Sequence, residues 1–364
     1  MEPFKNLFNT QTVKEIASNL ANENKSFNVK KFEKDILASL DSLEMKDRVR
    51  LIADALNQHS NLDYKQNLKV LTKCIINNNL KGFILWPFSQ YVEQYGLSHS
   101  KNINETFKLL ELITTNFTSE FAIRDFINTY PDESFAFLLS CAKSPNEHLR
   151  RFASEGSRPS LPWGKKIIDI ERLKDFTLIV LEKLKYDDSD YVRKSVANHI
   201  NDYNHIDPKF SLKILSRWSK EGVSEKLIRH ALRTLLKEGN SQALNILGYK
   251  SPKEIDAKIL SLNSKEIFEG DSIEVKVIIK NNNSKAKKIL VDYIIHYPKK
   301  NGRYTKKVFR LKDVEIKSKP IEITKKISFK SVTVRKHYEG KYYIELQING
   351  KLFNKKSFKL NEKN

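Results

Sequence analysis

Cysteine and clustered histidine are scarce in this sequence of 364 residues. The two cysteines, Cys74 and Cys141, lie 67 positions apart, and neither belongs to a CxxC pair. This spacing argues against a disulfide framework and against a zinc knuckle, so we expect two buried, reduced thiols. The eight histidines form no HExxH motif and no other cluster at the spacing of metal ligands. We therefore expect no metal site.

Long apolar runs and phosphate-binding glycine loops are also absent. The longest apolar run, FAFLLSCA at residues 135 to 142, is far shorter than the ~20 residues that span a membrane. The opening residues MEPFKNLFNTQTV have no apolar core of the kind found in signal peptides. Neither GxGxxG nor GxxxxGK followed by serine or threonine occurs, which removes the usual nucleotide-binding motifs. We expect a cytoplasmic protein that binds no membrane and needs no cofactor.

Positive charge, by contrast, is abundant and unevenly placed. The chain has 65 lysine and arginine residues against 44 aspartate and glutamate residues, a formal net charge of +21. Residues 251 to 364 hold 28 of the basic residues and 13 of the acidic ones, so this last third carries +15 of the total. A surplus of this size makes nucleic acid the first partner to consider.

Residues 10 to 248 show the pattern of amphipathic helices. Apolar residues recur at spacings of three and four, and short polar connections separate the runs. Three segments look like copies of one helical unit, and their aligned arginines are 43 and 36 positions apart, a period that suits HEAT-like repeats. We predict an all-α HEAT-like α-solenoid. The copies are residues 146 to 155 with Arg150, 188 to 198 with Arg193, and 223 to 233 with Arg229.

After residue 251 the hydrophobic period changes to about two. Runs rich in β-branched and aromatic residues alternate with turn signals such as Asn301-Gly302 and Asn349-Gly350. This pattern predicts a small all-β immunoglobulin-like sandwich. We place the linker at residues 248 to 256 and predict two domains, residues 1 to 250 and residues 251 to 364. The runs are residues 272 to 280, 288 to 297, 306 to 316, 321 to 329, 341 to 348 and 355 to 360.

A loop rich in constrained residues interrupts the helices within RRFASEGSRPSLPWGKK, residues 150 to 166. Its two prolines restrict the backbone, and its two glycines permit unusual backbone angles. Glu155 and Trp163 lie in this segment between basic residues. One interpretation makes this segment a rigid helix connector, in which Trp163 fills the core and Arg158 pairs with Glu155. The other makes it part of an active site on a surface that binds nucleic acid.

Two further acids favour the second interpretation. Asp202, in SVANHINDYNHIDP, stands near the end of its helix as Glu155 does, so stacked repeats would bring both carboxylates to one edge of the basic face. Glu120, in TSEFAIRDF, is a third candidate, although an acid after Thr118 also suits a helix N-terminus. Carboxylates stabilise the oxocarbenium-like charge that develops when a glycosidic bond breaks. Trp163 could add cation–π attraction to a positively charged base.

Several of these strings resemble the AlkC group of bacterial HEAT-like DNA glycosylases, in the superfamily that also contains AlkD. The resemblance covers nearly the whole chain, and SEGSRPxLPW is its most specific part. In the last third it concerns the Ig-like domain of the AlkC form that carries one. The matching strings are PFKNLFN, LEMKDRVRLIADAL, FILWPFSQYVEQYG, RRFASEGSRPSLPW, SVANHINDYNHIDP, LIRHALRTLLKEG, VDYIIHYPKKNGRYTKKVF and TVRKHYEG.

The resemblance implies base excision repair by a monofunctional, metal-free hydrolysis that removes N-alkylated bases and leaves an abasic site. The implied substrate is 3-methyladenine foremost, then 3-methylcytosine and 1-methyladenine, in double-stranded DNA bound by a monomer at the nucleoid. Matching residue by residue assigns catalysis to Glu155 and Asp202, with Glu120 as the third acid and Trp163 against the lesion. A non-catalytic HEAT-like scaffold for nucleic acid, or a protein-binding solenoid, remains open as an alternative.

Phosphate contacts are expected from basic residues of the helical repeats and from two basic loops of the sandwich. Each of these residues, taken alone, is equally compatible with a solvated charge on the surface or with a cation that interacts with the dipole at a helix end. The sandwich loops could meet DNA in the minor groove. The candidates are Arg150, Arg151, Arg158, Arg193, Lys194, Arg229, His230, Arg233, Lys299, Lys300, Arg303, Arg335 and Lys336.

Overall fold

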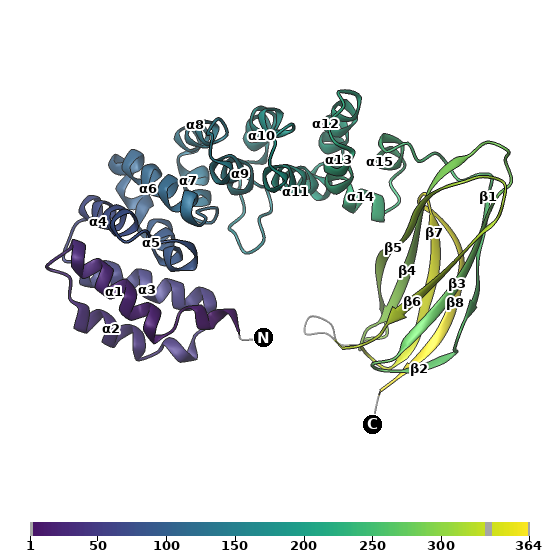
Figure 1. Cartoon of the computed structure of the whole chain (residues 1–364), viewed down its shortest axis with the longest axis horizontal. Helices are drawn as coiled ribbons and strands as arrows, with labels where there is room; N and C mark the ends of the chain where they lie inside the picture. Colours follow the sequence, from purple (N-terminus) through teal and green to yellow (C-terminus); the bar gives the residue numbers. More distant parts are fainter. Residues whose placement is uncertain (1–2, 332–336, 363–364) are drawn as a thin grey trace. The chain divides into compact units, whose positions relative to one another are not determined.

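The computed structural model describes residues 3 to 331 and 337 to 362 (Figure 1). The chain folds into two compact units, residues 1 to 203 and residues 204 to 364, which we call unit 1 and unit 2. The boundary between them falls inside a helix and not at the change from helices to strands near residue 255. The division into domains at residues 1 to 250 and 251 to 364 stays a prediction.

Unit 1 consists of helices, as the spacing of its apolar residues predicts (Figure 1). They are η1 (Phe4–Leu7), α1 (Thr10–Glu23), α2 (Val29–Leu37), η2 (Leu40–Ser42), α3 (Met45–His59), α4 (Tyr64–Asn77), η3 (Gly82–Leu85), α5 (Trp86–Tyr95), η4 (Gly96–Asn102), α6 (Ile103–Asn116), α7 (Ile123–Thr129), α8 (Pro131–Cys141), α9 (Glu147–Gly156), α10 (Ile170–Leu184) and α11 (Asp190–Ile206), where η marks a 3-10 helix. Helices pack on near neighbours in the sequence, such as α4 on α6 and α6 on α9, which is the contact pattern of a repeat array.

Local signals explain where these helices begin and which face they bury. The side chains of Asn9, Asp63 and Asn146 accept hydrogen bonds from backbone N–H groups of the first helical turn. Burial of one apolar side chain contributes roughly 1.5 to 3 kcal/mol, so the apolar face fixes how each helix is turned. The apolar residues that α10 buries are Leu173, Phe176, Val180, Leu181 and Leu184.

The two cysteines are buried and free, as predicted. Burial raises the pKa of both Cys74 and Cys141 to about 12, so neither thiol ionises near neutral pH. No helix in the described part of the chain is long and apolar enough to cross a membrane.

In its described residues, unit 2 joins four helices to a sandwich of two sheets. One sheet has the strand order β1-β3-β6 and the other β2-β8-β7-β4-β5, with β2 parallel to β8 and the other pairs antiparallel. The helices are α12 (Pro208–Lys220), α13 (Glu225–Ala231), α14 (Arg233–Lys237) and α15 (Ser241–Ile246). The strands are β1 (Ile255–Leu262), β2 (Glu266–Phe268), β3 (Ser272–Asn281), β4 (Lys287–Pro298), β5 (Tyr304–Ile316), β6 (Ile321–Ser328), β7 (Gly340–Ile348) and β8 (Lys351–Asn361).

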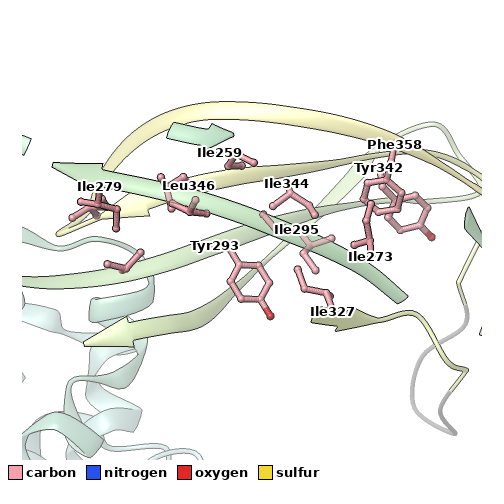
Figure 2. Close-up of a cluster of buried hydrophobic side chains, with 14 of the residues drawn as sticks. Ile259, Ile273, Ile279, Tyr293, Ile295, Ile327, Tyr342, Ile344, Leu346 and Phe358 are labelled. Carbon is pink, nitrogen blue, oxygen red and sulfur yellow. The ribbon is translucent and has the colours of Figure 1, made fainter. Parts of the chain in front are cut away.

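The core of the sandwich lies between its two sheets (Figure 2). Ile259 and Ile273 from the three-stranded sheet and Ile295 and Ile344 from the five-stranded sheet belong to one buried cluster. Alternate residues of β3 are buried, which is the pattern that the period of two predicts.

Strand β1 is missing from the six predicted runs, and it begins at Ile255, inside the predicted linker at residues 248 to 256. Its two fully buried residues, Ile255 and Ile259, are four positions apart. The pairing of β1 with β3 also shifts register between Ile259 and Ser261. This irregularity breaks the alternation that marks β3 to β8 in the sequence. Strand β2 is missing from the predicted runs as well, and its three residues are too few to show a period.

Within unit 2 the last helices pack tightly on the sandwich. Gly239, between α14 and α15, and Gly350, in the turn from β7 to β8, are in backbone contact, with no room for a Cβ on either. The hydroxyl of Tyr249 donates to a carboxylate oxygen of Asp313 on β5 at 2.5 Å. The side-chain amide of Asn349 donates to the carbonyl of Lys250 at 2.8 Å. Helices α12 to α15 and the sandwich are therefore one packed body.

Candidate active site

Two carboxylates from different helices meet on one buried arginine. Arg158, in the loop after α9, donates from Nη1 to Glu155 Oε1 at 2.6 Å. Its Nε and Nη2 donate to the two carboxylate oxygens of Asp202, on α11, at 2.9 Å each. Glu155 and Asp202 are 6% and 7% exposed, so the three side chains form a nearly desolvated group, which we call the ion triad. The predicted proximity of Glu155 and Asp202 is confirmed.

Additional donors fix the orientation of both carboxylates. The hydroxyl of Ser195 donates to Glu155 Oε2 at 2.6 Å, and the backbone N–H of Ser160 donates to Asp202 Oδ2 at 3.3 Å. Burial raises the pKa of Asp202, while the hydrogen bonds from Arg158 act in the opposite direction. A carboxylate held by a bidentate guanidinium has little rotational freedom, so the oxygens of Asp202 keep fixed directions.

His199 of α11 lies next to the ion triad and is fully buried. Its Nδ1 is 2.9 Å from the carbonyl oxygen of Ser154, and its Nε2 is 3.1 Å from the Thr177 hydroxyl. Burial, aided by the positive charges of Arg158 and Arg124, lowers the pKa of His199 to about 3. The imidazole is therefore neutral near pH 7 and adds no charge to the group.

Glu120 stands just before α7 and belongs to a second ion pair beside the triad. Its carboxylate accepts hydrogen bonds from the guanidinium of Arg151 and from the hydroxyl of Thr118. Arg151 also lies 3.7 Å from Glu155 Oε1 and 5.3 Å from the ring centroid of Tyr191, a side chain that is 42% exposed. Arg151 thus contacts both Glu120 and Glu155, and the accessible ring of Tyr191 lies against it at the edge of the site.

The loop that follows α9 presents Trp163 to solvent. Trp163 is 76% exposed and has a φ of 66°, in the left-handed region that bulky residues rarely adopt. The connector interpretation was wrong about Trp163, because this side chain does not fill the core. It was correct about the pair of Arg158 with Glu155. A single loop therefore provides both the cation of the ion triad and an exposed indole ring.

Arg124, on α7, anchors this loop and is a residue that sequence reasoning missed. Its guanidinium is fully buried and donates to the carbonyls of Gly156, Pro159 and Lys165, with Nη1 at 2.9 Å from Gly156 and Nη2 at 3.4 Å from Pro159. Burial lowers the pKa of Arg124 to about 10. The only sequence signal is an arginine between the apolar residues Ile123 and Phe126 of a short helix.

The predicted phosphate contacts have several different environments, and their role in DNA binding stays a prediction. In unit 1, Arg150 and Arg193 pair with Asp187 and Asp190, and Lys194 is exposed. In unit 2, Arg229 pairs with Glu225 and Asp313, Arg233 donates to the His230 carbonyl, and His230 is half-buried. At the turn from β4 to β5, Lys299, Lys300 and Arg303 are exposed. Arg335 and Lys336 lie outside the described residues.

Three comparisons identify relatives of this chain. Residues 256 to 362 match the family described as "Uncharacterised protein YhaZ, C-terminal Ig-like domain". The protein named "Uncharacterized protein YhaZ" of Bacillus subtilis (strain 168) is 35% identical over 355 residues, which cover 97% of this chain and 98% of the relative. The solved structure of Pseudomonas fluorescens alkylpurine DNA glycosylase AlkC, bound to DNA containing an abasic site analog, is 31% identical.

The likeness to the AlkC structure extends over both units. The alignment has a TM-score of 0.92 and covers 99% of this chain and 100% of the AlkC chain. The helical repeats and the Ig-like sandwich thus occur in the same order in both proteins, as the sequence resemblance implies. This chain belongs to the AlkC family, in the form that carries a C-terminal Ig-like domain.

Proposed function

We propose that this protein is a DNA glycosylase that hydrolyses the N-glycosidic bond of cationic N-alkylated bases, with 3-methyladenine as the main substrate and 3-methylcytosine and 1-methyladenine as further ones. The observation that carries the proposal is the convergence of Glu155 and Asp202 on Arg158, next to a loop with an exposed tryptophan. The full-length likeness to an alkylpurine DNA glycosylase supports it. The protein would act as a cytoplasmic monomer on double-stranded DNA of the nucleoid.

The proposed reaction needs carboxylates, but it needs no general acid to protonate the leaving base. An N-alkylated base already carries positive charge, so when the bond from C1′ to the base nitrogen breaks, its electron pair leaves with a neutral base. The carboxylates of Glu155 and Asp202 stabilise the oxocarbenium-like sugar. Water then bonds to C1′ and gives its proton to a carboxylate. Burial raises the pKa of Asp202, which makes this group a stronger proton acceptor than an ordinary aspartate.

Glu120 and Trp163 have supporting roles in this proposal. Glu120 adds a third negative charge through its contact with Arg151, which in turn lies against Glu155. The exposed indole of Trp163 supplies a π-face for a cationic base, an attraction of about 0.5 to 2 kcal/mol. The product is an abasic site, with both DNA strands intact.

Replacement of the two carboxylates tests this proposal. We expect Glu155→Gln and Asp202→Asn each to lower the single-turnover release of free 3-methyladenine from methylated duplex DNA by about 100- to 1000-fold, the loss typical of a group that stabilises transition-state charge. Glu44→Gln is the matched control, because Glu44 is an exposed glutamate of unit 1 that pairs with Lys5. Undiminished release by both variants would remove the proposed roles, and no release by the wild type would favour the non-catalytic scaffold.

The basic turn from β4 to β5 allows a separate test of DNA binding. Combined Lys299→Ala, Lys300→Ala and Arg303→Ala substitutions should weaken binding and flatten its salt dependence, because each lost phosphate contact reduces the slope of log K against log salt by about 0.9. Alanine at the exposed Lys317, Lys319 and Lys326 removes the same charge elsewhere on the sandwich. Equal slopes for the two triple variants in a salt titration would contradict a specific role for this turn.

A further inference from the structure

Lys46, on α3, contacts the loop that presents Trp163 although the two residues are 117 positions apart. Its Nζ donates to the backbone carbonyl of Trp163 at 2.6 Å. The same ammonium lies 5.9 Å from the centroid of the Trp163 ring and 5.1 Å from the centroid of the Phe121 ring. Phe121 directly follows Glu120, so Lys46 links the exposed indole to the segment that carries the third acid.

The backbone of Trp163 needs such an external contact. A left-handed φ is costly for a residue with a Cβ and a large ring, and it persists only where surrounding groups hold it. Arg124 and Asn128 of α7 hold the flanks of the loop, because Arg124 bonds to the carbonyl of Lys165 and Asn128 to that of Lys166. Neither of these side chains bonds to Trp163 itself. Among the residues that the structure describes, Lys46 is the side chain whose hydrogen bond reaches the strained residue.

We propose that Lys46 is a positioning residue that fixes Trp163 in its exposed, left-handed conformation for contact with the lesion. Lys46 was not among the predicted site residues. Its half-buried ammonium bonds to a carbonyl and lies near two aromatic faces, an arrangement that fixes the tryptophan instead of serving as a phosphate ligand. The effect on base release rests on the proposed glycosylase function, whereas the effect on Trp163 does not.

The test compares three variants of the full chain. Lys46→Met removes the charge and the N–H donors but keeps the aliphatic stem, and Lys46→Arg retains charge and donors. Lys69→Met is the control for charge, because Lys69 is an exposed lysine on α4 in the same unit. The chain has three tryptophans, so protein labelled with 5-fluorotryptophan gives one 19F signal each for Trp86, Trp163 and Trp218, and Trp163→Phe assigns the signal of interest.

We expect Lys46→Met to lower the single-turnover release of 3-methyladenine about tenfold or more, since small displacements of a contacting group cost rate. We also expect a narrower 19F line for Trp163, which reports faster motion. The buried Trp86 and Trp218 should keep their line widths, Lys69→Met should match the wild type, and Lys46→Arg should restore most of both properties. Chemical shift is not the readout, because the ammonium itself perturbs the nearby ring.

An unchanged Trp163 line width in Lys46→Met would overturn the proposal, whether or not the rate falls, because Lys46 would then act without positioning the ring. A wild-type protein that releases no base would refute the proposed function, and the line widths would still decide whether Lys46 fixes Trp163.

Discussion

Arg158→Met is expected to lower the free energy of unfolding by about 3 to 5 kcal/mol near neutral pH, the cost of removing one partner from a buried ion pair. The substitution leaves Glu155 and Asp202 in a nearly desolvated site without their shared cation. Methionine has a similar volume, so a cavity contributes little to the loss. Denaturant unfolding of the variant and the wild type measures the difference. Arg172→Met, which removes an arginine paired with Asp132 at the surface, should change stability little.

The loss of unfolding free energy in Arg158→Met should depend on pH. In the wild type burial raises the pKa of Asp202 and Arg158 opposes that increase, so the variant should have a still higher folded-state pKa. A carboxyl whose pKa is higher in the folded state binds a proton on folding, and stability is lost as pH rises from the unfolded-state pKa through the folded-state pKa. The deficit should therefore be largest at pH 7 to 8 and shrink toward the ordinary carboxyl range of about 4. A deficit that is constant with pH would contradict this account.

Gly350→Ala should destabilise unit 2 by about 3 kcal/mol or more, through overpacking against rigid backbone added to an unfavourable φ. A Cβ at Gly350 would overlap the carbonyl oxygen of Gly239 and lie 2.9 Å from its Cα. Backbone atoms of two turns cannot move aside as a flexible side chain does. The expected result is separation of the α14 to α15 connection from the sandwich, measured as a lower unfolding midpoint and faster amide exchange in the β7 to β8 turn.

Gly222→Ala is the matched control for this substitution. Gly222 lies in unit 2 with a φ of +79°, close to the +80° of Gly350, but a Cβ there would meet nothing within 4 Å. It should cost only about 1 to 2 kcal/mol, the penalty of a left-handed alanine. Equal losses for the two variants would show that backbone conformation, and not the contact with Gly239, sets the cost.

Sequence periodicity predicted both halves of the fold because a helix and a half-buried strand each impose their own period on the apolar residues. Helical spacing marked residues 10 to 248, and alternation marked six of the strands of the sandwich. Glu155 and Asp202 were also predicted to meet, since each stands near the end of its helix and stacked repeats bring such ends together. Strand β1 was not predicted because its register shift near Ile259 interrupts the alternation of buried and exposed residues.

The residues that organise the loop could not be predicted from the sequence. Arg124 and Lys46 donate hydrogen bonds to backbone carbonyls. Every residue has a backbone carbonyl, so the residue type at the accepting position does not reveal such a contact. The contact of Lys46 with Trp163 also joins positions 117 apart, with no repeat to relate them. The left-handed φ of Trp163 runs against residue preference, which reserves that region mainly for glycine and asparagine.

The conformation of Trp163 implies that stability and activity favour different residues at position 163. Glycine would relieve the strained φ and remove an exposed ring, so a screen for stability alone would reward the loss of tryptophan. A screen for survival of alkylation damage would reward its retention if the indole serves the lesion. Both screens can use one library that carries every amino acid at position 163. If the stability screen selects glycine and the survival screen selects tryptophan, the protein retains a locally unfavourable conformation at this position because its activity requires it.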